Sequence, residues 1–451
     1  MNEKFIEYFR KNFFENEDEL KIFLSSLSKH LKKTIRVNTN KIGSDELVER
    51  MKNLGYDLNP TFSKNVFYIE RGENFDEIER RLGFSLEHLM GYFYIQELGA
   101  SSSVFYLSDG VVDKKPYLIL DMASSPGGKT TQLAEFYPNS FIVANEFSRD
   151  RTAQLIANIE RMGNENIGIT CYNGQFIGRL TETFDKILLD APCSGEGIGF
   201  KAIETLRYWN LKNVKKIADL QEKLFESGLN ALKVGGEMLY STCTMNKIED
   251  EGVVGNIMNK YPGSFEISFE KRFWPHIDNT GGFFVCRIKK LSSIDYRFSP
   301  KFELCNEDIK ELSNNDRRII EKFSKEKGLD LENHSLLNYK GEILAMKSGN
   351  SYKEIQKRLY FIRLGKKIGK IEKGEFTPNY YLGRDFELAK VQKYDIKDQM
   401  ELDNFLRGME IGENLKDGIV QIRFDNINIG LGFASNSGRI KNIFPKLWLR
   451  K

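Results

Sequence analysis

The chain has 451 residues, of which 40% are hydrophobic and 29% charged, with a formal net charge of only +3. This composition is typical of a folded globular protein with about three domains, and it excludes wholesale disorder. No run approaches the roughly 18 apolar residues of a membrane span, and the N-terminus lacks an apolar signal core, so we expect no membrane association, no export and a cytoplasmic location. The five cysteines include no CxxC pair, which argues against a disulfide framework and against a zinc ribbon.

Residues 1–90 are expected to be mainly helical. Apolar residues recur at helical spacing between Phe5 and Phe13 and again between Leu20 and Leu27. A short strand is predicted at 34–38. A further helix is predicted at 46–54, with Ser44 or Asp45 near its N-cap.

Residues 92–290 alternate between strand and helix, which predicts a doubly wound parallel α/β sheet. Apolar runs predict strands at 117–120, 141–144, 167–170, 184–189 and 237–241. Helices are expected at 130–136, 149–162 and about 212–232. Two later apolar runs, 264–267 and 282–288, would form an antiparallel edge of the same sheet.

The composition changes near residues 291–300, and the final third mixes short helices with strands such as 418–424 and 427–433. Three stretches of the chain concentrate basic residues. They are 29–41 and 432–451, which hold no acid, and 353–370, in which Glu354 is the only acid. Such clusters suit the binding of a polyanion, although lysine-rich surfaces often serve solubility alone.

The segment Asp121–Thr130 lies between the first strand of the sheet and a helix, where doubly wound sheets bind ligands. A P-loop would need glycine at the position of Ala123, and the G-x-G-x-x-G fingerprint of dinucleotide sites is absent. Glu146 ends the second strand, where an acid can accept hydrogen bonds from ribose hydroxyls. S-adenosylmethionine, a nucleoside without phosphates, is the remaining candidate; the alternative is a tight turn without a ligand.

Two cysteines follow neighbouring strands of the predicted sheet. The fourth strand leads into Asp190 and Cys193, and the fifth leads into Cys243. Because the carboxyl ends of adjacent parallel strands meet at one edge, these three side chains are expected to converge beside the bound nucleoside. A single cysteine at such a position is more often packed than reactive, but two that converge with a carboxylate indicate chemistry.

The segments DMASSPGGKTTQLA, ILLDAPCSGEG and YSTCTMNKIEDE resemble the signature motifs of the RNA cytosine-C5 methyltransferases of the RsmB/RsmF type. RFWPHIDNTGGFFVCRIKK resembles the last catalytic motif of that family, and residues 35–40 are similar to its R-x-N-T element. Residues 430–445 resemble, more loosely, the PUA-like domain of the RsmF branch. The resemblance implies a Rossmann-like methyltransferase sheet at 91–292, a small α+β N-terminal substrate domain at 1–90 and a C-terminal α+β PUA-like RNA-binding domain at 300–451.

The resemblance also implies the chemistry. Cys243 would add to C6 of the cytosine as the nucleophile, Asp190 would bind the N3/N4 edge of the base, and Cys193 would assist release of the product. S-adenosylmethionine would be held by the loop residues Ala123, Ser124, Ser125, Pro126, Gly127, Gly128 and Lys129 and by Glu146, Asn173 and Asp190. Asn173 replaces the family's usual aspartate, so we expect weaker cofactor binding.

The expected partner is RNA, with small-subunit ribosomal RNA favoured and tRNA as the alternative. A largely non-catalytic RNA-binding assembly factor is the second hypothesis, and DNA methylation is disfavoured. No metal is expected, because the four histidines show no ligand spacing. Cys171, Cys286 and Cys305 are interpreted as packing residues, and a monomer is the default expectation.

Overall fold

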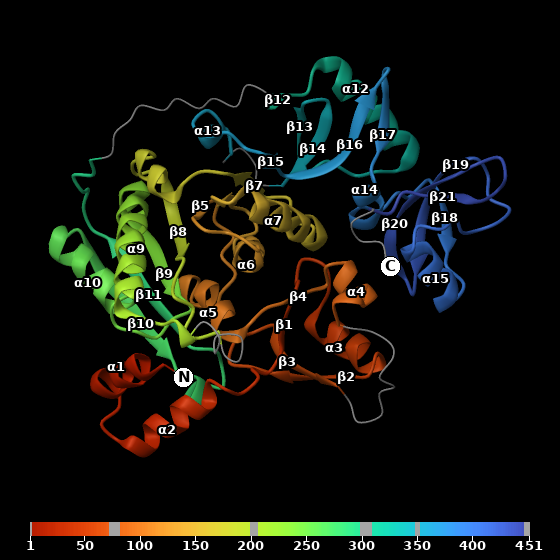
Figure 1. Cartoon of the computed structure of the whole chain (residues 1–451). Helices are drawn as coiled ribbons and strands as arrows, with labels where there is room; N and C mark the ends of the chain where they lie inside the picture. The colour runs from red at the N-terminus through yellow and green to blue at the C-terminus, as the bar shows by residue number, and fades with distance from the viewer. Residues whose placement is uncertain (1, 72–81, 199–205, 298–308, 348–351, 446–451) are drawn as a thin grey trace.

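An eight-stranded sheet organises the middle of the chain in the computed structural model, which describes residues 2–71, 82–198, 206–297, 309–347 and 352–445. Its strand order is β10-β11-β9-β8-β5-β6-β7-β15 (Figure 1). The five parallel strands are β5 (Leu118–Asp121), β6 (Phe141–Asn145), β7 (Ile167–Thr170), β8 (Phe184–Asp190) and β9 (Leu232–Thr242). The antiparallel strands are β10 (Phe265–Phe273), β11 (Phe283–Lys290) and β15 (Arg363–Leu364). The predicted doubly wound sheet with an antiparallel edge is therefore confirmed.

Helices cover both faces of this sheet, because successive side chains of a strand point to opposite faces and both sets are apolar. Leu118 and Leu120 pack on one face, and Ile119 packs on the other. The first face is covered by α9 (Leu211–Ala231), α10 (Glu251–Lys260) and the 3₁₀ helix η2 (Gly174–Arg179). The second face is covered by α5 (Leu98–Leu107), α6 (Gly128–Phe136) and α7 (Arg149–Met162).

The N-terminal part contains more strand than the mainly helical prediction for residues 1–90. Its antiparallel sheet has the order β2-β3-β1-β4. The strands are β1 (Thr34–Val37), β2 (Tyr56–Pro60), β3 (Val66–Arg71) and β4 (Phe93–Ile95). The helices are α1 (Glu3–Phe13), α2 (Glu17–Ser26), α3 (Ser44–Asn53) and α4 (Leu86–Leu89), with η1 (Leu82–Phe84). The prediction missed β2 and β3 because they mix exposed and buried residues without a clear period of two.

The two N-terminal helices pack away from their own sheet. Phe5, Phe9 and Phe23 form one core with Trp209, next to α9, and with Trp274, which precedes the short helix α11 (Pro275–Asp278). Figure 1 shows α1 and α2 below the eight-stranded sheet.

Two further sheets form the C-terminal part, at the upper right of Figure 1. The first has the order β12-β13-β14-β16-β17 and the second β18-β19-β20-β21. The first comprises β12 (Ile309–Glu311), β13 (Ser335–Tyr339), β14 (Glu342–Met346), β16 (Lys366–Glu372) and β17 (Glu375–Pro378), with α12 (Asn314–Lys327) and α13 (Tyr352–Gln356). The second comprises β18 (Gln392–Asp395), β19 (Gly418–Phe424), β20 (Ile427–Ala434) and β21 (Ile440–Asn442), with α14 (Tyr380–Asp385) and α15 (Gln399–Leu406). The strands predicted at 418–424 and 427–433 are confirmed as β19 and β20.

Strands cross the predicted domain boundaries in both directions. β4 lies beyond residue 90 but pairs with β1 of the N-terminal sheet. β15 lies beyond residue 300 but pairs with β7 of the central sheet. The three parts are thus joined by shared strands as well as by side-chain packing.

The basic clusters are not free of acids in space. Arg36 is buried and pairs with Glu135. In the 353–370 cluster, acids from other segments pair with four cations. The pairs are Lys353–Glu311, Arg363–Glu160, Lys366–Glu165 and Lys367–Glu342. The prediction that these cations lack acidic partners was wrong, because the partners are distant in sequence. Residues 446–451 of the last cluster lie outside the described residues, and so does Cys305.

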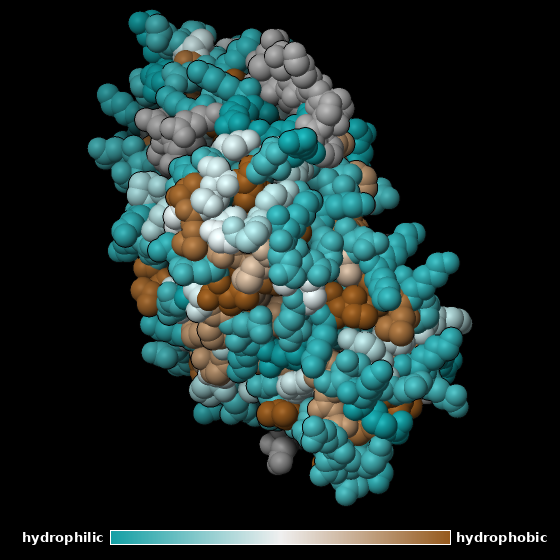
Figure 2. Space-filling view, turned by 90° about the vertical axis from the view of Figure 1, so that its left-hand side faces the viewer, coloured by the Kyte–Doolittle hydropathy of each residue, from teal (hydrophilic) through white to brown (hydrophobic). Residues whose placement is uncertain are grey.

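The surface on the side of α9 and α10 is mostly hydrophilic, with apolar groups in separated patches (Figure 2). None of the helices in the described ranges combines the length and hydropathy that a membrane span requires.

Candidate active site

The loop between β5 and α6 brings backbone close to its neighbours. Gly127 has a φ of 105°, in the left-handed region that favours glycine, and a Cβ there would lie 3.0 Å from Leu155. A Cβ on Gly128 would lie 3.1 Å from the ring of Tyr94. Ala123, Ser124, Ser125 and Pro126 complete the bend, and Lys129 follows in the first turn of α6. The two glycines therefore allow the loop to pack closely against Leu155 and Tyr94.

Two polar side chains follow the next strands of the sheet. Glu146, directly after β6, accepts hydrogen bonds from the backbone N–H groups of Ser125 (3.3 Å) and Ser148 (2.8 Å). Asn173 lies beyond β7 and caps η2, where its Oδ1 accepts from the N–H of Gln175 at 3.0 Å. Both follow strands at the carboxyl edge of the sheet, and neither lines the cavity beside the loop.

A cavity of about 190 Å³ opens beside this loop. It is lined by Tyr94, Ile95, Gln96, Glu97, Ala100, Asp121, Ala123, Ser124, Ser125, Pro126, Gly128, Lys129 and Asp190. Asp121 is buried, and burial raises its pKa to about 7. Its Oδ2 accepts from Thr130 at 2.7 Å, while its Oδ1 has no hydrogen-bond partner among the described residues. Asp121 thus offers a buried acceptor without a partner in the described part of the chain, beside the glycine-containing loop that Glu146 contacts. These features fit a nucleoside ligand that carries a cationic group.

The two cysteines meet where β8 and β9 end. The Sγ atoms of Cys193 and Cys243 lie 3.0 Å apart, and both residues are half-buried. The hydrogen bond with Cys243 and burial raise the pKa of Cys193 well above its ordinary value. Cys193 therefore keeps its proton, and its S–H can be directed toward the Cys243 sulfur.

Asp190 is fixed at the same edge by two donors. Lys129 Nζ donates to Oδ2 at 2.8 Å, and Ser241 Oγ donates to Oδ1 at 2.9 Å. Burial would lower the pKa of Lys129, but its pairing with Asp190 outweighs burial and raises the pKa, so Lys129 stays charged. The predicted convergence of Asp190, Cys193 and Cys243 is present, and Lys129 joins them.

Two buried glutamates, neither of which was predicted, hold the loops that carry Cys193 after β8 and Cys243 after β9. We call these two segments the cysteine loops. Glu196 Oε2 accepts from Thr244 Oγ1 (2.5 Å) and from the N–H of Met245 (3.2 Å), directly after Cys243. Its Oε1 accepts from Trp209 Nε1 (2.6 Å) and Asn246 Nδ2 (2.9 Å).

The second of these glutamates, Glu249, accepts through Oε2 from the N–H of Ser194 (2.9 Å), directly after Cys193. Gln221 Nε2 donates to the same oxygen at 3.0 Å, and Asn246 Nδ2 donates to Oε1 at 2.8 Å. Glu196 and Glu249 are fully buried. Neither glutamate is recognisable from the sequence, because most of the groups that donate to them come from other segments of the chain.

Arg36, in the segment similar to the R-x-N-T element, ties the N-terminal sheet to the loop. Its guanidinium donates to Gly128 O (3.2 Å), Thr131 Oγ1 (2.7 Å) and Gln96 Oε1 (3.0 Å), and it pairs with Glu135. The N-terminal part therefore forms one wall of the cavity and supports the loop from behind.

Together, the sheet order and the site define a methyltransferase that uses S-adenosylmethionine. The structure is similar to that of a methyltransferase homolog protein from Pyrococcus horikoshii, with 28% identity and a TM-score of 0.55 over 64% of this chain and 96% of that chain.

Sequence comparisons identify the family. Residues 112–289 match the family model described as 16S rRNA methyltransferase RsmB/F, and residues 1–98 match the N-terminal domain of 16S rRNA methyltransferase RsmF. The ribosomal RNA small subunit methyltransferase F of Aeromonas hydrophila is 32% identical over 95% of this chain and 93% of its own length. The protein of the same name from Serratia proteamaculans is 33% identical over 84% and 81%. The chain belongs to the RsmB/RsmF family of RNA methyltransferases.

Proposed function

We propose that the protein methylates C5 of a cytosine in small-subunit ribosomal RNA, with S-adenosylmethionine as methyl donor. The observation that carries this function is the 3.0 Å contact between Cys193 and Cys243, at the strand ends beside the cofactor loop and Asp190. Relatives named ribosomal RNA small subunit methyltransferase F, similar over nearly the whole chain, support the substrate class.

We assign the nucleophile to Cys243. Its thiolate forms a bond to C6 of the cytosine, and the displaced electron pair makes C5 enamine-like and nucleophilic. Bound S-adenosylmethionine supplies an electrophilic methyl group. Asp190, held by Lys129 and Ser241, hydrogen-bonds the N3/N4 edge of the base and stabilises the adduct.

Release of the product requires transfer of the C5 proton to a base, so that the C–H electron pair re-forms the C5–C6 double bond and the Cys243 sulfur leaves C6 as a thiolate. We assign the assisting role to Cys193, since it lies in contact with the Cys243 sulfur. The donor is held by residues 123–129, with Glu146 at the ribose, Asn173 near the adenine and Asp190 at the edge of the pocket. The amide of Asn173 can still accept a hydrogen bond, so weaker binding than with an aspartate is expected.

The flanking parts serve RNA binding in this proposal. Residues 1–90 form a substrate domain, 91–292 the methyltransferase domain and 300–451 a PUA-like domain that docks RNA. The two C-terminal sheets and the excess of basic residues in this third support such a role. The protein acts as a cytoplasmic monomer, and the target base leaves its helix or loop to reach Cys243.

The test is methyl transfer from labelled S-adenosylmethionine to unmodified ribosomal RNA, small subunits and tRNA in parallel, followed by digestion to nucleosides. Label in 5-methylcytidine of ribosomal RNA that vanishes in Cys243→Ala and persists in Cys171→Ala supports the proposal. Label in tRNA alone would identify tRNA, rather than ribosomal RNA, as the substrate. Binding of the donor without label in any RNA favours the non-catalytic assembly factor.

A further inference from the structure

A second and larger cavity, of about 520 Å³, lies where the N-terminal, central and C-terminal parts meet. Its central wall includes Pro138 and Asn166, which precede β6 and β7, and Met162 at the end of α7. These are the amino ends of the parallel strands, whereas Cys193 and Cys243 follow the carboxyl ends. The cavity is therefore separate from the methyl-transfer site.

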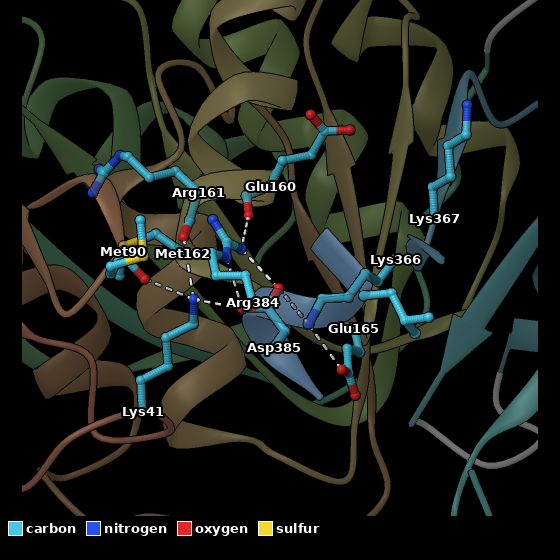
Figure 3. Close-up of polar contacts among 12 residues, drawn as sticks. Lys41, Met90, Glu160, Arg161, Met162, Glu165, Lys366, Lys367, Arg384 and Asp385 are labelled. Carbon is cyan, nitrogen blue, oxygen red and sulfur yellow. Dashed lines mark hydrogen bonds and ion pairs between the residues drawn. The ribbon is translucent and has the colours of Figure 1, made fainter. Parts of the chain in front are cut away.

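A buried cluster of cations forms one side of this cavity (Figure 3). Asp385 is shared by Lys41 (3.0 Å), Lys366 (3.1 Å) and Arg384 (2.7 Å). The second acid, Glu165, pairs with Lys366 at 2.9 Å. Three cations thus face two carboxylates.

Two further basic groups line the same cavity. His334 Nε2 lies 2.9 Å from Glu165, and Lys347 lies on the wall at the surface. With all three buried cations charged, Lys41, Lys366 and Arg384 exceed the carboxylates of Asp385 and Glu165 by one positive charge. Because an uncompensated buried charge is unfavourable, this excess favours an anion in the cavity.

The titration of Lys41 reports the same excess. Burial, followed by the charge of Arg384, lowers the pKa of Lys41 to about 7, although Asp385 opposes the shift. Lys366 adds to the lowering. The carbonyl oxygens of Met90 and Arg161 accept hydrogen bonds from Lys41 Nζ at 2.8 and 3.4 Å, so the amine is held in place in either protonation state.

The rest of the lining is rich in amides, which suit the edge of a base or a ribose hydroxyl. The amides are those of Asn40, Asn164, Asn166, Asn426 and Asn428. Asn164 is 7% exposed, and its Oδ1 has no hydrogen-bond partner among the described residues. A buried acceptor of this kind calls for a donor from a ligand. The volume also lies within the range of small-molecule pockets.

We propose that this cavity binds one nucleotide unit of the substrate RNA, with its phosphate against Lys41, Lys366 and Arg384 and its nucleoside against the asparagine amides. The inference rests on the proposed action on RNA and adds a contact point remote from Cys243. Since all three parts of the chain line the cavity, a nucleotide held there fixes the RNA relative to the catalytic sheet and selects which cytosine reaches the cysteines.

The experiment is isothermal titration calorimetry of the full chain at pH 8 with uridine 5′-monophosphate, inorganic phosphate and octauridylate, in buffers of different ionisation enthalpy. A group with a pKa of about 7 is about nine-tenths neutral at pH 8, so recharging Lys41 takes up close to one proton for each nucleotide bound. We expect uridine 5′-monophosphate to bind more tightly than phosphate, with proton uptake, and octauridylate to compete with it.

Two variants locate the binding. Lys347→Glu, at the exposed rim of the cavity, should weaken nucleotide binding at least tenfold, and Lys41→Met should abolish the proton uptake. Lys325→Glu, an equal charge change on α12 outside the cavity, should change the affinity less than twofold. The Lys347 variant keeps the test decisive if Lys41→Met fails to fold.

Binding that is unchanged in Lys347→Glu, or that occurs without proton uptake, would overturn the assignment to this cavity. If phosphate binds as tightly as uridine 5′-monophosphate, the cavity does not recognise the nucleoside, and the proposal of a nucleotide ligand is refuted. If octauridylate does not compete, the proposal that the nucleotide belongs to RNA is refuted. The outcome is independent of the proposed function: wild-type protein that methylates RNA without binding the nucleotide refutes this inference alone. Nucleotide binding by a protein that methylates no RNA refutes the proposed function instead.

Discussion

Replacing Glu196 by glutamine tests whether the buried carboxylate positions the nucleophile. Four donors converge on its two oxygens, and a glutamine amide offers only one oxygen. The best arrangement turns the NH₂ group toward Thr244, whose hydroxyl can rotate to accept, and leaves the N–H of Met245 without a partner. A buried unsatisfied N–H costs about 1–3 kcal/mol, and the remaining bonds lose their charge assistance.

Part of that loss is offset, because burial already disfavours the ionised form and raises the pKa of Glu196. We therefore expect Glu196→Gln to lower the free energy of unfolding by about 2 kcal/mol. The rotated Thr244 hydroxyl also changes its 3.0 Å contact with Ser194 Oγ, which links the two cysteine loops. We expect kcat to fall at least tenfold while KM for S-adenosylmethionine stays unchanged, since Glu196 touches no residue of the cofactor loop.

The assays are urea denaturation and steady-state methyl transfer with the donor and the RNA varied separately. Glu251→Gln is the matched control, because its carboxylate pairs with Arg272 near the surface and contacts neither cysteine loop. Full activity and unchanged stability in Glu196→Gln would refute the reasoning. An equal loss of kcat in Glu251→Gln would show that the loss in Glu196→Gln is a general effect of removing an acid.

Three further predictions follow from buried groups of the same region. Cys193→Ala should accumulate a covalent protein–RNA complex, visible on a denaturing gel, with slowed turnover; normal turnover without that complex contradicts its role in release. Arg36→Ala should lower the free energy of unfolding by about 3–5 kcal/mol in urea denaturation, because it leaves Glu135 buried without its partner, whereas Lys32→Ala, which breaks a surface pair, should cost less than about 1 kcal/mol. The folded state holds the Asp121 proton more tightly than the unfolded chain does, because its pKa is raised to about 7, so this group lowers stability as the pH rises from about 4 to 7. Asp121→Asn should remove this pH dependence, measured as the difference in the free energy of unfolding between pH 5 and pH 8. If the variant shows the same difference as the wild-type protein, Asp121 is ionised at both pH values and the prediction is refuted.

Apolar runs bounded by turns made the central sheet predictable. The helix predicted at 149–162 matches α7, and the run at 141–144 matches β6 within one residue. β9 starts at Leu232, five residues before the strand predicted at 237–241. The prediction began late because Gly235 and Gly236 resemble the end of a helix, although both lie within the strand. β15 gave no signal, since a two-residue strand has no periodicity and its partner is distant in the chain.

The candidate site was predictable where strand ends dictate proximity. Asp190 and Cys243 had to meet once β8 and β9 were neighbours. Glu196 and Glu249 were missed, because a glutamate is expected in water unless its donors are known, and those donors come from distant segments. The basic clusters failed for the same reason: counting neighbours in sequence finds no acid beside Lys366, whereas the fold supplies Glu165 and Asp385.

The pairing of β15 with β7 has a consequence for synthesis. β7 is complete at residue 170, but the strand that pairs with its outer side begins at residue 363. At about 5–20 residues per second, the ribosome needs roughly 10–40 s to make the intervening segment. During that time the nascent sheet presents an open edge on which a foreign strand can align. A shortened chain that stops at residue 292 would keep this edge permanently, and we expect it to aggregate.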